Sequence, residues 1–135
     1  MTGALSASRE ARAGLLVRLE ALVDSRPDVS FAFVFGSFLE QGEFRDIDIG
    51  IWTTPSASSR VDVELAADAS ATLGVPVDVR RVNDAPVSFL FHVLRRRALV
   101  VRDEIMLATL MERTARAYHD SAPLVERATR EAFAR

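Results

Sequence analysis

The chain of 135 residues contains no cysteine, no lysine and no long apolar run. Without cysteine, disulfide bonds and thiolate metal sites are excluded. Without lysine, a phosphate-binding loop of the Walker A type is excluded, because that loop requires its lysine. No apolar run approaches the length of a membrane span, and the N-terminal residues lack the basic and then apolar pattern of a signal peptide. We therefore expect a cytoplasmic protein without a membrane segment.

Neither sign of charge dominates the sequence. All 17 basic residues are arginine, and 19 acidic residues bring the net charge to −2. Proteins that bind nucleic acid usually carry a basic patch, so we expect no direct contact with nucleic acid. The one basic cluster, at residues 95–97, follows an apolar segment. It is typical of a solvated helix C-terminus, and a contact with a phosphate or a partner is the alternative.

The spacing of apolar residues predicts alternating helices and strands. Hydrophobic residues make up 49% of the chain and charged residues 27%, as in globular domains. Helical periodicity predicts helices over 8–25, 60–73, 86–97 and 103–119, an interruption at 120–123, and a last helix over 124–133. Strands are predicted over 31–35, 46–52, 75–82 and 99–102. This order indicates an α/β (α+β) fold in a single domain over 1–135, with a core at about 15–102 and C-terminal helices at about 103–134.

A glycine and a serine end the first predicted strand. Residues 31–35 are uninterruptedly apolar and predict a buried strand, and Gly36 and Ser37 follow directly. Glycine lets the backbone turn sharply and approach a ligand closely. The N–H groups at the start of the short helical stretch predicted over 38–41, together with the hydroxyl of Ser37, suit an anionic phosphate. We therefore take Gly36 and Ser37 as candidate phosphate-binding residues.

Two aspartates share one face of the next predicted strand. Residues 46–52 alternate strictly between isoleucine and other residues up to Ile51, so Asp46 and Asp48 point away from the isoleucine side. Two carboxylates so close together repel each other unless a cation lies between them. Oxygen ligands of this kind suit Mg²⁺ or Mn²⁺. Solvated aspartates on an edge strand are the alternative, although aspartate is a poor strand former.

A third aspartate lies on the strand predicted over 75–82. Val77 and Val79 share a buried face, and Asp78 points to the other. If this strand lies beside residues 46–52, Asp78 joins the other two aspartates, and three carboxylates can hold two metal ions. Asp78 could then also take the proton from an attacking hydroxyl. A simple ion pair with Arg80, two residues further along the same face, is the alternative.

Gly36-Ser37, Asp46-x-Asp48 and the later Asp78 resemble the minimal nucleotidyltransferases, the MNT domains of the polymerase-beta-like superfamily. The resemblance covers about residues 15–120 and implies a nucleotidyltransferase fold, with a small mixed sheet flanked by helices. It implies that Gly36 and Ser37 bind the nucleotide, and that Asp46, Asp48 and Asp78 are both the catalytic residues and the ligands of Mg²⁺ or Mn²⁺. It further implies an antitoxin that transfers AMP from ATP to a tyrosine of a HEPN-type ribonuclease toxin.

The loop between the two motifs departs from the family pattern. Only eight residues separate Ser37 from Asp46, fewer than is usual, and Arg45 stands where the family commonly has serine. Arg45 could bind a phosphate, or it could neutralise Asp46 and weaken metal binding. Two alternatives therefore remain: an inactive antitoxin that neutralises its toxin by binding, and a transferase that modifies a small molecule such as an antibiotic.

The predicted C-terminal helices have a broad apolar side. Packing on the parent sheet would explain it, and so would a surface for a partner or for a homo- or hetero-oligomer. The residues on this side are Ile105, Leu107, Leu110, Met111, Thr114 and Tyr118.

Overall fold

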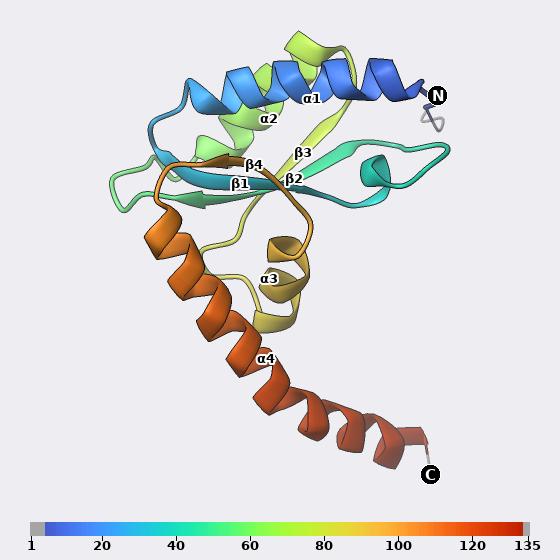
Figure 1. The fold of residues 1–135 in the computed structure, drawn as a ribbon, viewed down its shortest axis with the longest axis vertical. Coiled ribbons are helices and arrows are strands. Elements are labelled where there is room, and N and C mark those ends of the chain that lie inside the picture. The colour runs from blue at the N-terminus through green and yellow to red at the C-terminus, as the bar shows by residue number, and fades with distance from the viewer. Residues whose placement is uncertain (1–4, 134–135) are drawn as a thin grey trace.

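The structure is a computed structural model that describes residues 5–133. A four-stranded sheet forms its centre (Figure 1). The strand order is β3-β2-β1-β4. β1 pairs antiparallel with both of its neighbours, whereas β2 and β3 run parallel. The predicted mixed sheet is therefore confirmed. The strands are β1 (Val29–Phe35), β2 (Ile47–Thr53), β3 (Val77–Arg81) and β4 (Arg97–Val101).

Helices cover both faces of this sheet (Figure 1). α1 (Arg9–Asp24) and α2 (Val61–Leu73) lie on one face, and α3 (Val87–Leu94) and α4 (Glu104–Phe133) lie on the other. A short 3₁₀ helix, η1 (Ser37–Leu39), follows β1. This arrangement confirms the α/β (α+β) architecture that the alternating pattern predicts.

β1 is apolar from Phe31 to Phe35 because both of its faces are covered. Ala32 and Val34 pack in the cluster beneath α1 and α2, whereas Phe31 and Phe33 pack in the cluster with α3 and α4. A strand buried on both faces has no reason to alternate between apolar and polar residues. The uninterrupted run is thus explained by the helical layers on the two sides.

The two faces of β2 differ: one is apolar, and the other carries Asp48. Ile47, Ile49 and Ile51 are fully buried on the side of α1 and α2. On the opposite face, a Cβ added to Gly50 would stand 2.9 Å from Cγ1 of Val93 in α3. α3 therefore packs against the backbone of β2 at Gly50, two residues beyond Asp48.

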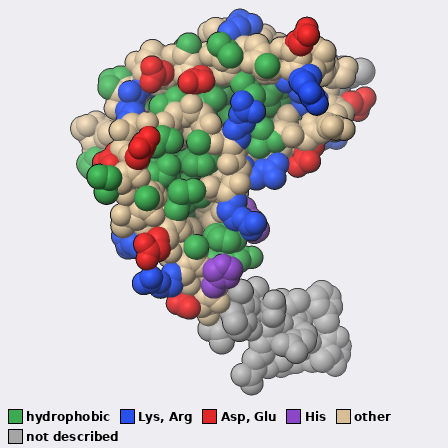
Figure 2. Space-filling view, in the orientation of Figure 1, with side chains coloured by type: hydrophobic (Ala, Val, Ile, Leu, Met, Phe, Trp, Pro, Cys, Tyr) green, Lys and Arg blue, Asp and Glu red, His purple; other side chains and the backbone are tan. Residues whose placement is uncertain are grey.

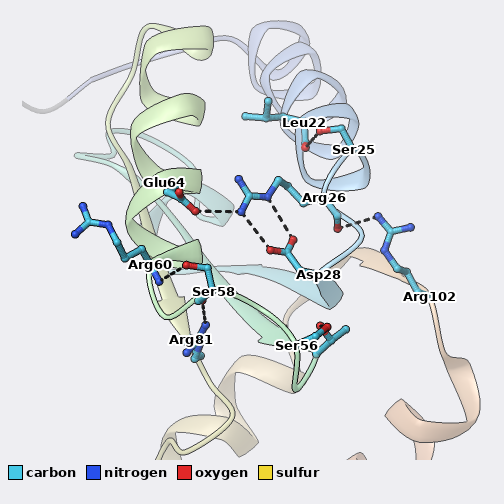
Figure 3. A network of polar contacts seen from close by, with 11 residues as sticks. Leu22, Ser25, Arg26, Asp28, Ser56, Ser58, Arg60, Glu64, Arg81 and Arg102 are labelled. Atoms are coloured by element: carbon cyan, nitrogen blue, oxygen red, sulfur yellow. Dashed lines mark hydrogen bonds and ion pairs between the residues drawn. The ribbon is translucent and has the colours of Figure 1, made fainter.

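A polar network braces the edge of the molecule where α1 turns into β1 (Figure 3). The guanidinium of Arg26 pairs with Asp28 at 3.2 Å and with Glu64 of α2 at 3.4 Å. Arg102, between β4 and α4, donates to the backbone carbonyls of Val29 and Arg26 at 2.8 and 3.2 Å. This network fixes α2 and the start of α4 relative to β1.

The C-terminal segment forms one helix rather than the two that the sequence predicts. α4 runs from Glu104 to Phe133 and passes through residues 120–123 without ending. Pro123 removes one helical hydrogen bond and costs about 3 kcal/mol in a helix interior, but its flanks contain strong helix formers such as alanine, leucine and glutamate. The helix changes direction along its second half, as a proline allows (Figure 1).

The apolar side of α4 is only partly covered by the rest of the domain. Leu107 and Thr114 are buried, whereas Ile105 is 81% exposed. Packing on the domain therefore accounts for part of the apolar side that the sequence shows. No helix within residues 5–133 combines the length and the apolar character that a membrane crossing needs.

Of the basic cluster at residues 95–97, Arg95 alone lies at the helix C-terminus that the sequence predicts, and all three residues are exposed. α3 ends at Leu94, Arg95 caps it, Arg96 lies in the bend that follows, and Arg97 begins β4. The helix ends early because the chain turns back at once to pair with β1, where Arg97 lies opposite Val34. On the face shown in Figure 2, arginine side chains lie apart from one another and among acidic ones.

Candidate active site

Three aspartates converge where β2 and β3 run side by side. The parallel register places Asp48 directly beside Asp78, and Asp46 immediately precedes β2. One carboxylate oxygen from each of the three lies within 4.8 Å of the others. All three side chains are partly buried. The structure thus brings together the three carboxylates that the sequence singles out.

The negative charges of this cluster oppose one another. The pKa of Asp48 is raised from 3.8 to about 6, first by burial and then by the charges of Asp46 and Asp78 and a hydrogen bond with Asp46. The positive charge of Arg80 acts against this rise. A divalent cation between the carboxylates would relieve the repulsion.

The residues present fit a divalent metal ion of the Mg²⁺ type. Carboxylate oxygen is the ligand that Mg²⁺ and Mn²⁺ prefer, and three such groups reach a common point here. A cation there would draw electron density from a phosphoryl oxygen and lower the pKa of a bound hydroxyl. The cluster can therefore support phosphoryl chemistry on a ligand placed beside it.

Arg80 and Arg45, which could neutralise Asp78 and Asp46, differ in their contacts with the cluster. Arg80 pairs with Asp78 at 3.5 Å, with the side chains 61% and 47% exposed. The ion pair considered for Asp78 therefore exists, and it leaves Asp78 within the cluster. Arg45 is exposed, and within residues 5–133 its side chain makes no ion pair with Asp46. The structure gives no sign that Arg45 neutralises the cluster.

Gly36 lies directly against the carboxylate of Asp48. Its backbone has φ +83° and ψ −166°, a combination that is essentially restricted to glycine. A Cβ built on Gly36 would stand only 2.4 Å from Oδ2 of Asp48. Glycine is thus required here both for the turn and for the space that Asp48 occupies.

Contacts with the domain core fix the loop after Gly36. Phe38 is 2% exposed and packs edge-on against Phe44, with ring centroids 4.8 Å apart. Arg12 of α1 donates to the carbonyls of Phe38, at 2.6 Å, and of Gly42. These contacts fix η1, while Ser37 at its start remains exposed.

A cavity of about 450 Å³ opens beside this loop, between the end of β1, η1 and α3. Its volume lies in the range of small-molecule sites. Gly36 and Ser37 line it together with the end of β1, but the sequence does not predict five further charged or aromatic lining residues beyond β1. Two of these five residues, Arg95 and Arg96, belong to the basic cluster that the sequence shows, but only the fold reveals that they line this cavity. The five are Glu40, Phe89, His92, Arg95 and Arg96.

The comparison with protein families identifies this arrangement. Residues 18–105 match the family described as polymerase beta, nucleotidyltransferase. The chain belongs to this family. The matched segment includes Gly36, Ser37 and the three clustered aspartates, and it ends at the start of α4.

Solved structures of antitoxins share the fold of this nucleotidyltransferase. A toxin–antitoxin complex with AMP-PNP matches with a TM-score of 0.69 and 19% identity over 89% of this chain and 97% of the other. The MntA–HepT toxin–antitoxin complex matches with a TM-score of 0.65 and 17% identity, over 93% and 99%. The complex of tri-AMPylated HEPN toxin and MNT antitoxin from Shewanella oneidensis matches with a TM-score of 0.63 and 17% identity, over 87% and 98%. None of the curated proteins matches this nucleotidyltransferase.

Proposed function

We propose that this nucleotidyltransferase is a metal-dependent protein adenylyltransferase and the antitoxin of a HEPN-type ribonuclease toxin. It transfers AMP from ATP to a tyrosine of the toxin, in the cytoplasm, and all 135 residues form one functional domain. The observation that carries this proposal is the convergence of three carboxylates beside the Gly36-Ser37 loop and its cavity.

Each of these residues has a distinct role in the proposed reaction. Gly36 and Ser37 bind the triphosphate with backbone N–H groups and a hydroxyl. Asp46, Asp48 and Asp78 hold Mg²⁺ or Mn²⁺, which polarises the phosphoryl oxygens and stabilises the charge of the leaving group.

The transfer itself exchanges one phosphorus–oxygen bond for another. The tyrosine hydroxyl oxygen forms a bond to the α-phosphorus of ATP, while the bond from that phosphorus to the bridging oxygen of the β-phosphate breaks. Pyrophosphate leaves with the electron pair of the broken bond, and Asp78 accepts the proton of the hydroxyl. Asp78 suits this role because its side chain is 47% exposed and can meet an acceptor that arrives from outside.

The structural neighbours support a protein acceptor. They are antitoxins in complexes with toxins, and in one of them the HEPN toxin carries AMP groups. This chain covers 97–99% of the neighbouring chains described above, so it matches antitoxins over nearly their whole length.

The proposal is tested by the state of the toxin after the antitoxin has been removed. The product of the adjacent gene is incubated with the antitoxin, Mg²⁺ and ATP, is separated from it under denaturing conditions, is refolded, and is assayed for RNA cleavage. An adenylyltransferase leaves the separated toxin inactive only when ATP was present. If the separated toxin regains full cleavage after every treatment, whereas the intact complex is inactive without ATP, the antitoxin acts by occlusion and the proposal is wrong.

A further inference from the structure

Arg96 and Glu40 form an ion pair at the wall of the cavity beside the Gly36-Ser37 loop. Nη2 of Arg96 donates to Oε1 of Glu40 at 3.0 Å, and both residues line the cavity. Glu40 follows η1, whereas Arg96 lies in the bend between α3 and β4. The pair therefore joins the loop that begins at Gly36 to the C-terminal end of α3.

The loop does not need this ion pair to hold its position. Phe38 is buried against Phe44, and Arg12 binds two backbone carbonyls of the loop from the side of α1. The Arg96–Glu40 pair is much more exposed, with side chains 40% and 67% accessible. Exposed pairs of this kind contribute little to stability, so a purely structural role explains the Arg96–Glu40 contact poorly.

A triphosphate is a stronger partner for Arg96 than a single carboxylate. Its phosphate oxygens carry more negative charge, and the planar guanidinium matches their geometry with two parallel hydrogen bonds. Glu40 places a negative charge in the same cavity, where it opposes an anionic ligand until Arg96 or the ligand's own cation offsets it.

Of the two neighbouring arginines, Arg95 also lines this cavity, whereas Arg97 does not. The guanidinium of Arg95 lies 5.1 Å from the centre of the Phe91 ring. Arg97 begins β4 and lines a different cavity, beside α1. Of these three arginines, Arg96 is the one that the described structure pairs with a carboxylate inside the cavity.

We propose that Arg96 is a ligand of the ATP triphosphate, that Glu40 occupies it in the nucleotide-free protein, and that ATP displaces Glu40. This inference rests on the proposed function, since it takes ATP as the ligand of the cavity. Glu40 then acts as an internal competitor that lowers the affinity for ATP, and Arg96 supplies a contact that depends on the β- and γ-phosphates.

The test measures the binding of ATP and of AMP, with Mg²⁺, to the full chain by titration calorimetry. Loss of a charge-assisted contact in Arg96→Gln weakens ATP binding about tenfold or more and changes AMP binding little, because AMP lacks the outer phosphates. Loss of the competing carboxylate in Glu40→Gln tightens ATP binding about threefold, which corresponds to the free energy of an exposed ion pair. In the double variant the benefit of Glu40→Gln disappears. Arg97→Gln is the matched control and binds ATP like the unchanged protein.

Several results would overturn the inference. Unchanged ATP affinity in Arg96→Gln, or an equal loss for ATP and AMP, would show that Arg96 is no triphosphate ligand. Weaker ATP binding in Glu40→Gln would show that the pair braces the loop instead of competing with the nucleotide. No binding of ATP by the unchanged chain would overturn this inference together with the proposed function. ATP binding with the expected variant pattern but without AMP transfer would contradict the proposed function alone.

Discussion

Gly36 and Asp48 are in such close contact that the missing side chain of one makes room for the carboxylate of the other. A Cβ on Gly36 would stand 2.4 Å from Oδ2 of Asp48 and 3.2 Å from its Cγ. The turn that opens the candidate phosphate-binding loop and the central carboxylate of the candidate metal site are thus one structural unit. A substitution at either residue therefore alters the space available to the other.

This contact predicts that Gly36→Ala abolishes activity by moving Asp48. The added methyl group must displace the carboxylate, and a misplacement of about 1 Å at a reacting centre can cost about 100-fold in rate. Gly42→Ala is the matched control, because Gly42 also has a positive φ, +97°, but no atom of residues 5–133 lies within 4 Å of an added Cβ. Both variants lose about 1–2 kcal/mol of stability from the strained backbone. Thermal melts and transfer rates check this, and equal activity of the two variants would contradict it.

The raised pKa of Asp48 predicts that the metal-free protein gains stability when this charge is removed. The folded-state pKa of about 6 lies above 3.8, so the group's contribution to stability is fully present below pH 3.8 and is lost as the pH rises through 6. Asp48→Asn in EDTA at pH 7.5 should therefore be more stable than the unchanged chain, by about 1 kcal/mol after a discount for solvent screening, or about 4 °C in Tm.

Calorimetric scans at two pH values check this prediction. The stabilisation by Asp48→Asn should shrink at pH 4.5, where the folded-state Asp48 is already protonated. Asp68→Asn on the exposed face of α2 is the control for a general effect of removing one negative charge. The same gain in both variants, or a gain that grows at low pH, would contradict the account of a repulsive carboxylate cluster.

The ion pair between Arg80 and Asp78 predicts competition between Arg80 and the metal ion. Arg80→Gln frees a carboxylate that lies within 3.5 Å of the guanidinium, so Mn²⁺ should bind about two- to fivefold more tightly, the scale of an exposed ion pair. Arg45→Gln is the matched control, and it should leave the affinity nearly unchanged because Arg45 makes no ion pair with Asp46. Mn²⁺ titrations followed by electron paramagnetic resonance measure both. A larger effect of Arg45 than of Arg80 would refute this assignment.

The convergence of the three aspartates could be predicted from the sequence because it depends on local rules. Strict alternation places Asp46 and Asp48 on one side of the β2 segment. Asp78 joins them if β3 lies beside β2 with its polar face on the same side. The parallel register that sets Asp48 next to Asp78 is a tertiary property, but any neighbouring arrangement with matched faces brings the carboxylates near one another.

The rest of the site depends on contacts between distant segments. No local pattern shows that Glu40 reaches Arg96, which is 56 residues away, or that Phe89 and His92 face the same cavity. The predicted break at residues 120–123 failed for a related reason. Proline lowers helix stability locally, but the sequence alone does not show that good helix formers on both sides carry the helix through Pro123.

The most direct test of the central claim follows the α-phosphate of ATP. The protein, Mg²⁺, ATP labelled on the α-phosphate and the product of the adjacent gene are incubated together, and the label on each protein is measured after denaturing separation. The proposed function predicts label on the toxin, located on a tyrosine, and at least a 100-fold loss with Asp46→Asn, because one proposed ligand of the metal site is removed. Unchanged labelling of the toxin by Asp46→Asn, or no label on the toxin with the unchanged protein, would contradict it.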